Sequence, residues 1–230
     1  MAVVGIVILA IQVSAEDTPV LKTLKEKVSY GLGVDMARTF KRQGIEADVD
    51  LVMKGLKDGL SGEKLLVPEE ELRTIMLGFQ HELRRRQLEA LKVASEENKK
   101  RGEAFLAENK KKEGVVTLPS GLQYKILKKG SGKKPSEADT VECHYRGALI
   151  IGTELDSSDA GKPATFKVTG VIPGWREALQ LMPVGSKWQL FIPPHLAYGE
   201  KGDGGKIKTM IGPNQTLIFE VELISVQKKE

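Results

Sequence analysis

The sequence contains few of the residues on which most enzyme chemistry depends. Its 230 residues include one cysteine, three histidines and two tryptophans. Because Cys143 is alone, the chain can form neither an intramolecular disulfide nor a metal site built from several cysteines. The histidines do not have the spacing of metal ligands; they are His81, His144 and His195. We therefore expect no metal site, and a fold that is stabilised by packing.

Cofactor-binding motifs are missing as well. The glycine-rich residues 199–205 lack the Walker spacing, and Ile207 follows Lys206 where a phosphate-binding loop requires Ser or Thr. Gly31 and Gly33 lie within a helical pattern and do not follow a strand, which excludes a dinucleotide fingerprint. No nucleophile elbow occurs. If the chain is an enzyme, it therefore needs neither a cofactor nor a covalent intermediate.

Long apolar runs are also scarce. The one at residues 2–11 is too short to span a bilayer. It is followed by Val13-Ser14-Ala15 and the acidic Glu16, a pattern typical of a signal peptide over residues 1–15. No Lys or Arg precedes Lys22, so the usual positive start is missing, and a mis-set start codon or a buried helix are the alternatives. We expect an exported protein whose mature chain has no integral membrane segment.

The charges are numerous but balanced. The chain carries 35 basic and 31 acidic residues, a net charge of +4. Its basic runs, at residues 84–86, 99–101 and 110–112, lie in a highly charged helical segment without interleaved aromatic residues. A solvated helix face explains these runs better than a nucleic-acid site does, so no nucleic-acid partner is expected.

Three helices are predicted in the first half. The first has one apolar stripe at steps of three or four residues, formed by Leu21, Leu24, Val28, Leu32, Met36 and Phe40. The second begins at Asp48 or Asp50 and stops at Ser61-Gly62. The third opens after Pro68 and meets no strong breaker before Gly114, so residues 69–112 could form one helix about 65 Å long.

The long helix changes character along its length. Its first half has an apolar stripe, whereas residues 96–101 and 108–113 are almost wholly charged or polar, which predicts that the first half packs and the second half spans. Three short amphipathic segments make a thin core, and we therefore infer a homodimer. The predicted division is a helical dimerisation domain at residues 16–83 and a linker helix at residues 84–113.

Residues 114–230 have the pattern of strands. The predicted strands are residues 115–118, 122–127, 140–145, 165–168, 187–192 and 216–226, and only residues 175–181 are typical of a helix. The fold class is therefore α+β: an all-α N-terminal domain, a long linker helix, and a curved antiparallel sheet around a short helix.

Four motifs in this half resemble the FKBP-type peptidyl-prolyl cis-trans isomerases. They are "VECHYRGALIIGTELDSS" at residues 141–158, "VIPGWREALQLMPVG" at 171–185, "AYG" at 197–199 and "TLIFEVELISV" at 216–226. The N-terminal half is similar to the companion domain of the bacterial macrophage infectivity potentiator-like subgroup, through residues 27–62 and 102–127. In that subgroup the N-terminal domain dimerises, and a long helix carries each isomerase domain outward.

The resemblance implies a proline pocket and a role for its residues. Trp175 is expected to form the pocket floor, the Ile172 N–H and the Tyr198 hydroxyl to bind substrate carbonyls, and Asp156 to polarise or orient the rotating bond. The other expected pocket residues are Tyr145, Phe166, Val171, Ile211 and Phe219. Seen alone, Tyr145, Phe166 and Phe219 would be read as core residues and Asp156 as a turn residue; their joint order favours a site.

The sequence departs from the family in two places. Leu155 stands where the family usually has Phe before the Asp, which removes an aromatic wall. Residues 200–211 do not follow the common eukaryotic pattern, and only Ile211 is carried over from this segment.

The resemblance also implies partners and a location. It predicts a periplasmic or cell-surface bacterial protein, without a cofactor, that acts as a dimeric folding helper on proline-containing unfolded proteins and binds the family's macrolide inhibitors. The alternative is a holdase chaperone or surface interaction protein with a weak or vestigial isomerase pocket.

Overall fold

The computed structural model describes residues 20–227 except 63, 159–160 and 206–210, and the predicted signal peptide lies outside this range. The chain divides into two compact units, one up to Gln80 and the other from His81 onward. The first unit is helical and the second contains the sheet, so the predicted α+β class is confirmed. None of the described helices is both long enough and apolar enough to cross a membrane.

The predicted helices of the first unit are confirmed. They are α1 (Leu24–Gln43), α2 (Val49–Ser61) and the start of α3 (Glu69–Asn109). Thr23 caps α1 in a capping box with Glu26, and Asp48 caps α2 by accepting from the N–H groups of Asp50 and Leu51. Both helices end at glycines in the left-handed conformation, Gly44 and Gly62.

The apolar side chains of these helices are poorly covered within one chain. No residue of α1 is buried, and the only buried residue of α2 is Asp58. Large apolar side chains of both helices are exposed, for example Leu32 at 67% and Leu60 at 81%. The first unit therefore does not bury its own apolar faces.

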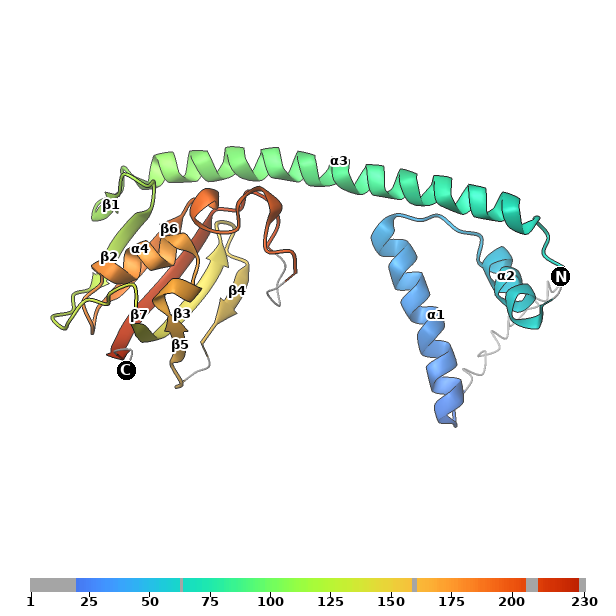
Figure 1. The fold of residues 1–230 in the computed structure, drawn as a ribbon, viewed down its shortest axis with the longest axis horizontal. Coiled ribbons are helices and arrows are strands. Elements are labelled where there is room, and N and C mark those ends of the chain that lie inside the picture. The colour runs from blue at the N-terminus through green and yellow to red at the C-terminus, as the bar shows by residue number, and fades with distance from the viewer. Residues whose placement is uncertain (1–19, 63, 159–160, 206–210, 228–230) are drawn as a thin grey trace, which may run out of the picture. The chain divides into compact units, whose positions relative to one another are not determined.

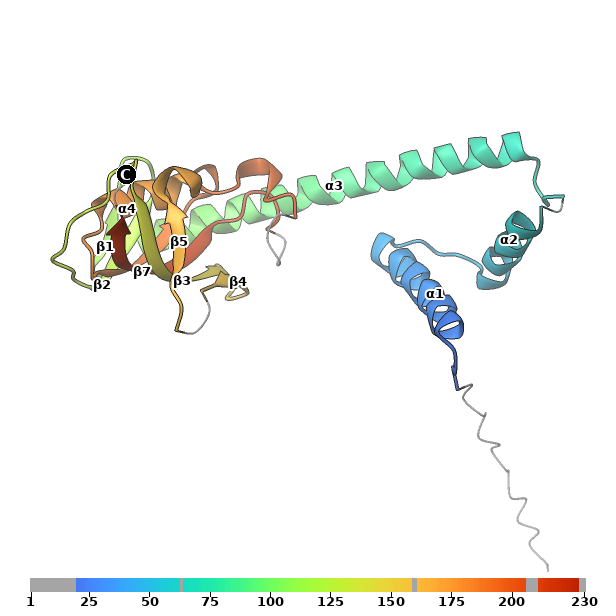
Figure 2. The same cartoon turned by 60° about the horizontal axis from the view of Figure 1, so that its bottom comes forward.

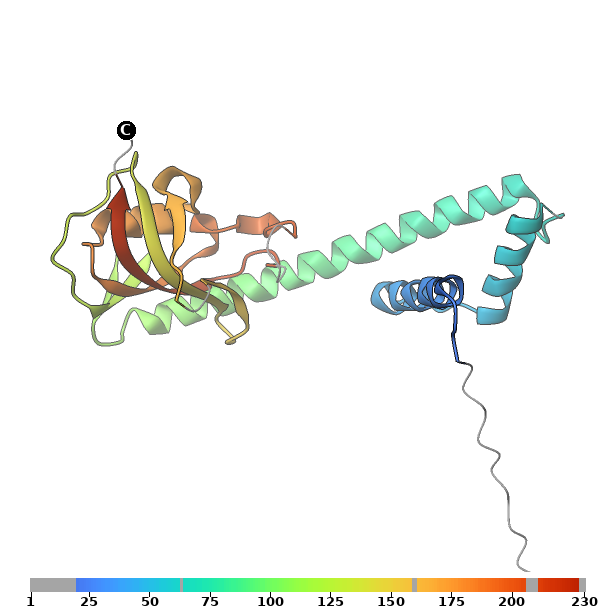
Figure 3. The same cartoon turned by 90° about the horizontal axis from the view of Figure 1, so that it is seen from below.

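The second unit is built on a seven-stranded antiparallel sheet with the order β1-β2-β6-β7-β3-β4, in which β5 also pairs with β3. Figure 2 shows β4 and β5 beside β3, and Figure 3 shows how the long strands β3 and β7 curve. The strands are β1 (Val115–Thr117), β2 (Gln123–Lys128), β3 (Thr140–Leu149), β4 (Glu154–Ser157), β5 (Ala164–Lys167), β6 (Lys187–Ile192) and β7 (Leu217–Gln227).

The predicted short helix is α4 (Pro173–Leu181), which lies across the sheet (Figure 1). Pro173 occupies the first helical position, where its missing N–H leaves no intrahelical bond unmade. Trp175, Ala178 and Leu179 are buried, at the spacing of one helix face. This face closes the core, whose fully buried members include Leu122, Val141, Cys143, Val168, Met182, Leu190, Ile192, Leu217, Val221 and Leu223.

Strand β4 was not among the predicted strands. Its sequence, Glu-Leu-Asp-Ser, has little intrinsic preference for a strand, and only Leu155 is buried. The ladder to β3 forms it, because Gly147 pairs with Asp156 and Arg146 pairs with Ser157. Tertiary pairing therefore overrides the local composition, and it does so at the strand that contains Asp156.

In the described part of the chain, three short 3-10 helices connect the elements around the core. They are η1 (Val168–Gly170), η2 (Pro194–Leu196) and η3 (Gly199–Lys201). The first leads into α4, and the other two lie between β6 and β7 along the chain.

The last turns of α3 pack against the sheet instead of spanning solvent as the charged composition predicts. Phe105 contacts Phe191 with ring centroids 6.0 Å apart. The Asn109 side-chain amide donates to Gln123 Oε1 at 3.0 Å, and Gln123 Nε2 donates to the carbonyl of Leu106 at 2.9 Å. The basic residues at 84–86, 99–101 and 110–112 are exposed, as predicted. The composition of this segment predicts its charged face but not its narrow packed face.

Candidate active site

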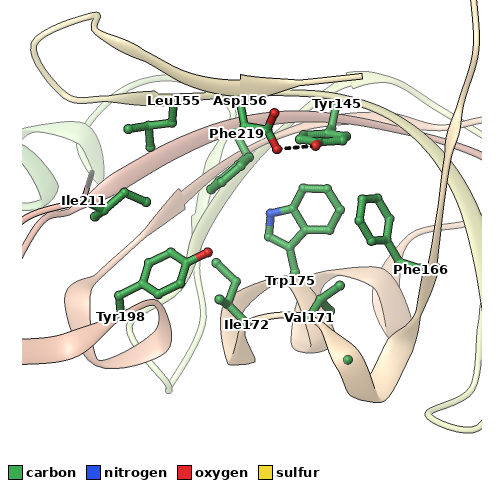
Figure 4. A pocket seen from close by; sticks show the side chains of 11 residues that line it. Tyr145, Leu155, Asp156, Phe166, Val171, Ile172, Trp175, Tyr198, Ile211 and Phe219 are labelled. Carbon is green, nitrogen blue, oxygen red and sulfur yellow. Dashed lines mark hydrogen bonds between the residues drawn. The ribbon is translucent and has the colours of Figure 1, made fainter. Parts of the chain in front are cut away.

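A cavity of about 280 Å³ lies between α4 and the curved sheet (Figure 4). All nine site residues expected from the sequence line it, together with Leu155 and Gly170. These residues come from separate segments of the unit: Tyr145 from β3; Leu155 and Asp156 from β4; Phe166 from β5; Gly170 from η1; Val171 and Ile172 from the two positions between η1 and α4; Trp175 from α4; Tyr198 and Ile211 from the segments after β6; and Phe219 from β7.

Trp175 is the central side chain of this pocket and is only 4% exposed. Its ring is nearly perpendicular to three neighbouring rings, with centroids 5.4 Å from Tyr145, 5.5 Å from Phe166 and 5.3 Å from Phe219. Such edge-to-face contacts are favourable and hold the indole in one orientation. The indole N–H is buried and has no hydrogen-bond partner among the described residues, so a donor is left free at the pocket.

Asp156 lies at the exposed edge of the pocket, and its carboxylate accepts a hydrogen bond from the Tyr145 hydroxyl at 2.5 Å (Figure 4). The two residues come from adjacent strands, so the sheet itself sets their geometry. A short bond to a charged acceptor fixes both side chains at the mouth of an otherwise apolar cavity.

Gly147 is a supporting residue that the sequence analysis missed. It pairs with Asp156 on one side and with Phe219 on the other. A Cβ atom at this position would collide with the Phe219 ring. A glycine within a strand often marks such a close approach, and its place in the middle of β3 was the available signal.

Two further donors belong to residues that line the pocket. Ile172 is the N-cap residue of α4, and no group in the described part of the chain accepts a hydrogen bond from its N–H. Tyr198 is half-buried, and burial raises the pKa of its hydroxyl, with the Asp203 and Asp156 carboxylates adding to the effect. The Tyr198 hydroxyl therefore keeps its proton at neutral and mildly alkaline pH and can donate a hydrogen bond.

The described residues include one cysteine and three histidines, none of which lines the pocket. They contain no group of His, Cys, Asp and Glu side chains that could hold a metal ion. Burial, followed by the charge of Glu142, raises the pKa of the Cys143 thiol to about 12, so this cysteine is not a nucleophile. His144 contacts Ser158, and His195 Nε2 lies 2.9 Å from the carbonyl oxygen of Ser120.

Comparison with known proteins identifies the family. Residues 25–126 match the model of the domain amino terminal to FKBP-type peptidyl-prolyl isomerase, and residues 131–224 match that of the FKBP-type peptidyl-prolyl cis-trans isomerase. The chain is 50% identical over 216 residues to the outer membrane protein MIP of Legionella longbeachae, covering 94% of this chain and 91% of that protein. The chain belongs to the FKBP-type peptidyl-prolyl cis-trans isomerases.

Other relatives of this isomerase agree with the assignment. The chain is 42% identical over 210 residues to the peptidyl-prolyl cis-trans isomerase Mip of Coxiella burnetii, and this match covers 91% of this chain and 90% of that protein. Its fold matches the crystal structure of FkpA from Escherichia coli with a TM-score of 0.67 and 32% identity, over 91% of this chain and 99% of that one. The expected resemblance to the macrophage infectivity potentiator-like subgroup is thereby confirmed, and this protein is a peptidyl-prolyl isomerase.

Proposed function

We propose that this isomerase accelerates rotation about X-Pro bonds by removing the bond from water and favouring its twisted form. Amide resonance sets a barrier of about 18–20 kcal/mol, so the uncatalysed reaction takes tens to hundreds of seconds. The observation that carries the proposal is the cavity floored by Trp175 and walled by aromatic and aliphatic side chains, with few polar groups at its edges.

The physical argument rests on the change in polarity during rotation. A twisted amide has lost its resonance and carries a less polar carbonyl, so a dry apolar pocket disfavours the planar ground state more than the transition state. A barrier lowered by about 7 kcal/mol gives a 10⁵-fold acceleration. No proton transfer is needed for this rotation.

Three polar groups at the pocket have a role in this proposal. The free N–H of Ile172 and the protonated Tyr198 hydroxyl bind substrate carbonyls. Asp156, held by Tyr145, orients or polarises the rotating bond at the pocket mouth. The apolar residues receive the prolyl ring, and Trp175 lies beneath it. The same apolar cavity suits the macrolide inhibitors of the family.

The test compares the two tryptophans of the chain. Trp175→Ala and Asp156→Ala are expected to lower kcat/KM for a short X-Pro peptide by about tenfold or more, because each removes a group that contacts the reacting segment. Trp188→Ala is the matched control: Trp188 is also 4% exposed, but it stacks on Tyr124 and does not line the pocket. It should lower the unfolding midpoint as Trp175→Ala does, because both leave a large cavity, and it should retain activity.

Two results would contradict this site. Unchanged rates in both pocket variants would remove the assignment of the residues. Equal losses in the variants of Trp175 and Trp188 would show that the effect comes from stability. Phe at each position, which keeps most of the buried volume, repeats the comparison if either alanine variant fails to fold.

We further propose that the protein is exported, dimerises through its first unit and helps exported proteins to fold. Export is supported by the apolar residues 2–11 and the small residues before Glu16. Dimerisation is supported by the exposed apolar side chains of α1, α2 and the first half of α3. Large exposed apolar areas mark interaction surfaces. The same exposed side chains favour a second function, a holdase chaperone that binds unfolded clients directly.

A further inference from the structure

Ile211 lies at an edge of the pocket where no helix or strand of the described chain holds it. Its side chain is nevertheless 2% exposed. Figure 4 shows Ile211 and Leu155 on the side of Trp175 that is away from Phe166, so they form an aliphatic edge to a largely aromatic pocket. The position of this edge must come from contacts outside regular secondary structure.

Asp203 supplies contacts to both backbone polar groups of Ile211. Its Oδ1 accepts from the Ile211 N–H at 2.8 Å, and its own N–H donates to the Ile211 carbonyl at 3.0 Å. Asp203 is itself only 3% exposed. The approach is so close that a Cβ atom on the preceding residue, Gly202, would collide with the Ile211 carbonyl oxygen, and Gly202 has a left-handed φ of 68°.

The residues that follow Ile211 are held from another direction by α3. The Asn98 side-chain amide donates to the carbonyl of Pro213 at 2.9 Å, and the amide of Asn214 donates to Ser95 Oγ at 2.8 Å. At Gly102 the helix passes so close to Thr216 that a Cβ atom would collide with the threonine Oγ1. The segment from Ile211 to Thr216 is therefore fixed at its start by Asp203 and further along by α3.

We propose that Asp203 is a positioning residue of the isomerase pocket, which fixes Ile211 in the wall that the substrate meets. The proposal rests on the proposed function, because the place of Ile211 matters only if this pocket receives the prolyl segment. Without the carboxylate, the buried Ile211 N–H loses its acceptor, and a buried donor without a partner is unfavourable enough to drive the segment toward water. The side chain then leaves the aliphatic edge. The influence of the Asp203 charge on the pKa of Tyr198 agrees with a place close to the site.

A double-mutant cycle in the full-length protein tests this role. Asp203→Ala and Ile211→Ala are each expected to raise KM for an X-Pro peptide about fivefold, with kcat within about twofold, because each removes part of the binding wall. The double variant should be no worse than either single one, since both changes remove the same wall. Asp203→Asn should retain the wild-type KM, because the amide oxygen can still accept from the Ile211 N–H.

Asp139→Ala is the matched control. Asp139 is a buried carboxylate that accepts from a backbone N–H at 2.8 Å, that of Ser136, and it does not line the pocket. This variant should lower the unfolding midpoint and leave KM unchanged.

The outcomes separate this proposal from the one it rests on. If Ile211→Ala raises KM and Asp203→Ala does not, or if their effects multiply in the double variant, the positioning role is wrong and the pocket stands. If Ile211→Ala has no effect, both the role of Asp203 and the place of Ile211 in the site are wrong, while Trp175→Ala still reports on the pocket itself.

Discussion

At the scale of single residues, the pocket depends on its lining side chains and on Gly147, which has no side chain. The aromatic residues follow from the motifs that the sequence shares with its family. Gly147 and Asp203 do not, because their importance lies in what approaches them: the Phe219 ring in one case and the Ile211 backbone in the other. Such close approaches depend on how the folded chain brings these groups together, so they cannot be read from composition or spacing.

Gly147→Ala tests the close approach beneath the Phe219 ring. The added methyl group should displace the ring, lower kcat/KM and reduce the free energy of unfolding by about 1–3 kcal/mol, as overpacking a core does. Denaturant unfolding and a peptide isomerisation assay measure the two effects. Combining it with Phe219→Leu makes room for the methyl group and should restore part of the stability. A double variant less stable than Gly147→Ala would show that the collision is not the cause.

At the scale of elements, the helices were predictable and part of the sheet was not. Periodic apolar residues, side-chain caps and glycine stops define α1 and α2, and a proline at the first position and one apolar face define α4. Strand β4, by contrast, exists because β3 lies beside it. The packing of the last turns of α3 was not predictable for a related reason. Only a narrow face of them is buried, through Gly102 and Asn109, and these two residues do not form an apolar stripe.

The contact of α3 with the pocket wall can be tested at Asn98. Asn98→Ala should raise KM about two- to threefold, because the Pro213 carbonyl loses its donor while α3 itself gains helix propensity. Glu96→Ala, at an exposed position on the same helix, is the control and should have the KM of the wild type. Equal KM values for the two variants would show that α3 does not support the wall.

At the scale of the whole molecule, the two units differ in how far they bury their apolar side chains. The second buries a continuous core, and the first leaves its apolar stripes exposed within one chain. Composition and periodicity predicted this contrast, since three short amphipathic helices cannot enclose a core. They could not predict which partner covers the stripes, because apolar contacts are non-directional and do not by themselves specify a partner.

A second copy of the chain is the partner we expect. Protein isolated from the periplasm of an expressing bacterium should have the mass of a chain that begins at Glu16. Light scattering after size exclusion should give twice that mass. Replacing the exposed Leu32 and Leu60 with Lys should yield the mass of one chain, because charge at an apolar contact is unfavourable. A single-chain mass for the unaltered protein would contradict the dimer.

An aggregation assay tests the holdase function. If the Trp175→Ala protein suppresses the aggregation of an unfolded client as well as the wild type does, the holdase function is favoured.

The buried thiol of Cys143 has a practical consequence for measuring distances in the expected dimer. Since this side chain is wholly inaccessible and its pKa is raised to about 12, it should not react with maleimide reagents at neutral pH. A cysteine introduced on an exposed face of either unit would then be the single labelled position in each chain. Spin or fluorescent probes could be attached without removing the native residue. Distances between the two chains of the proposed dimer would then be measurable in an otherwise unaltered protein.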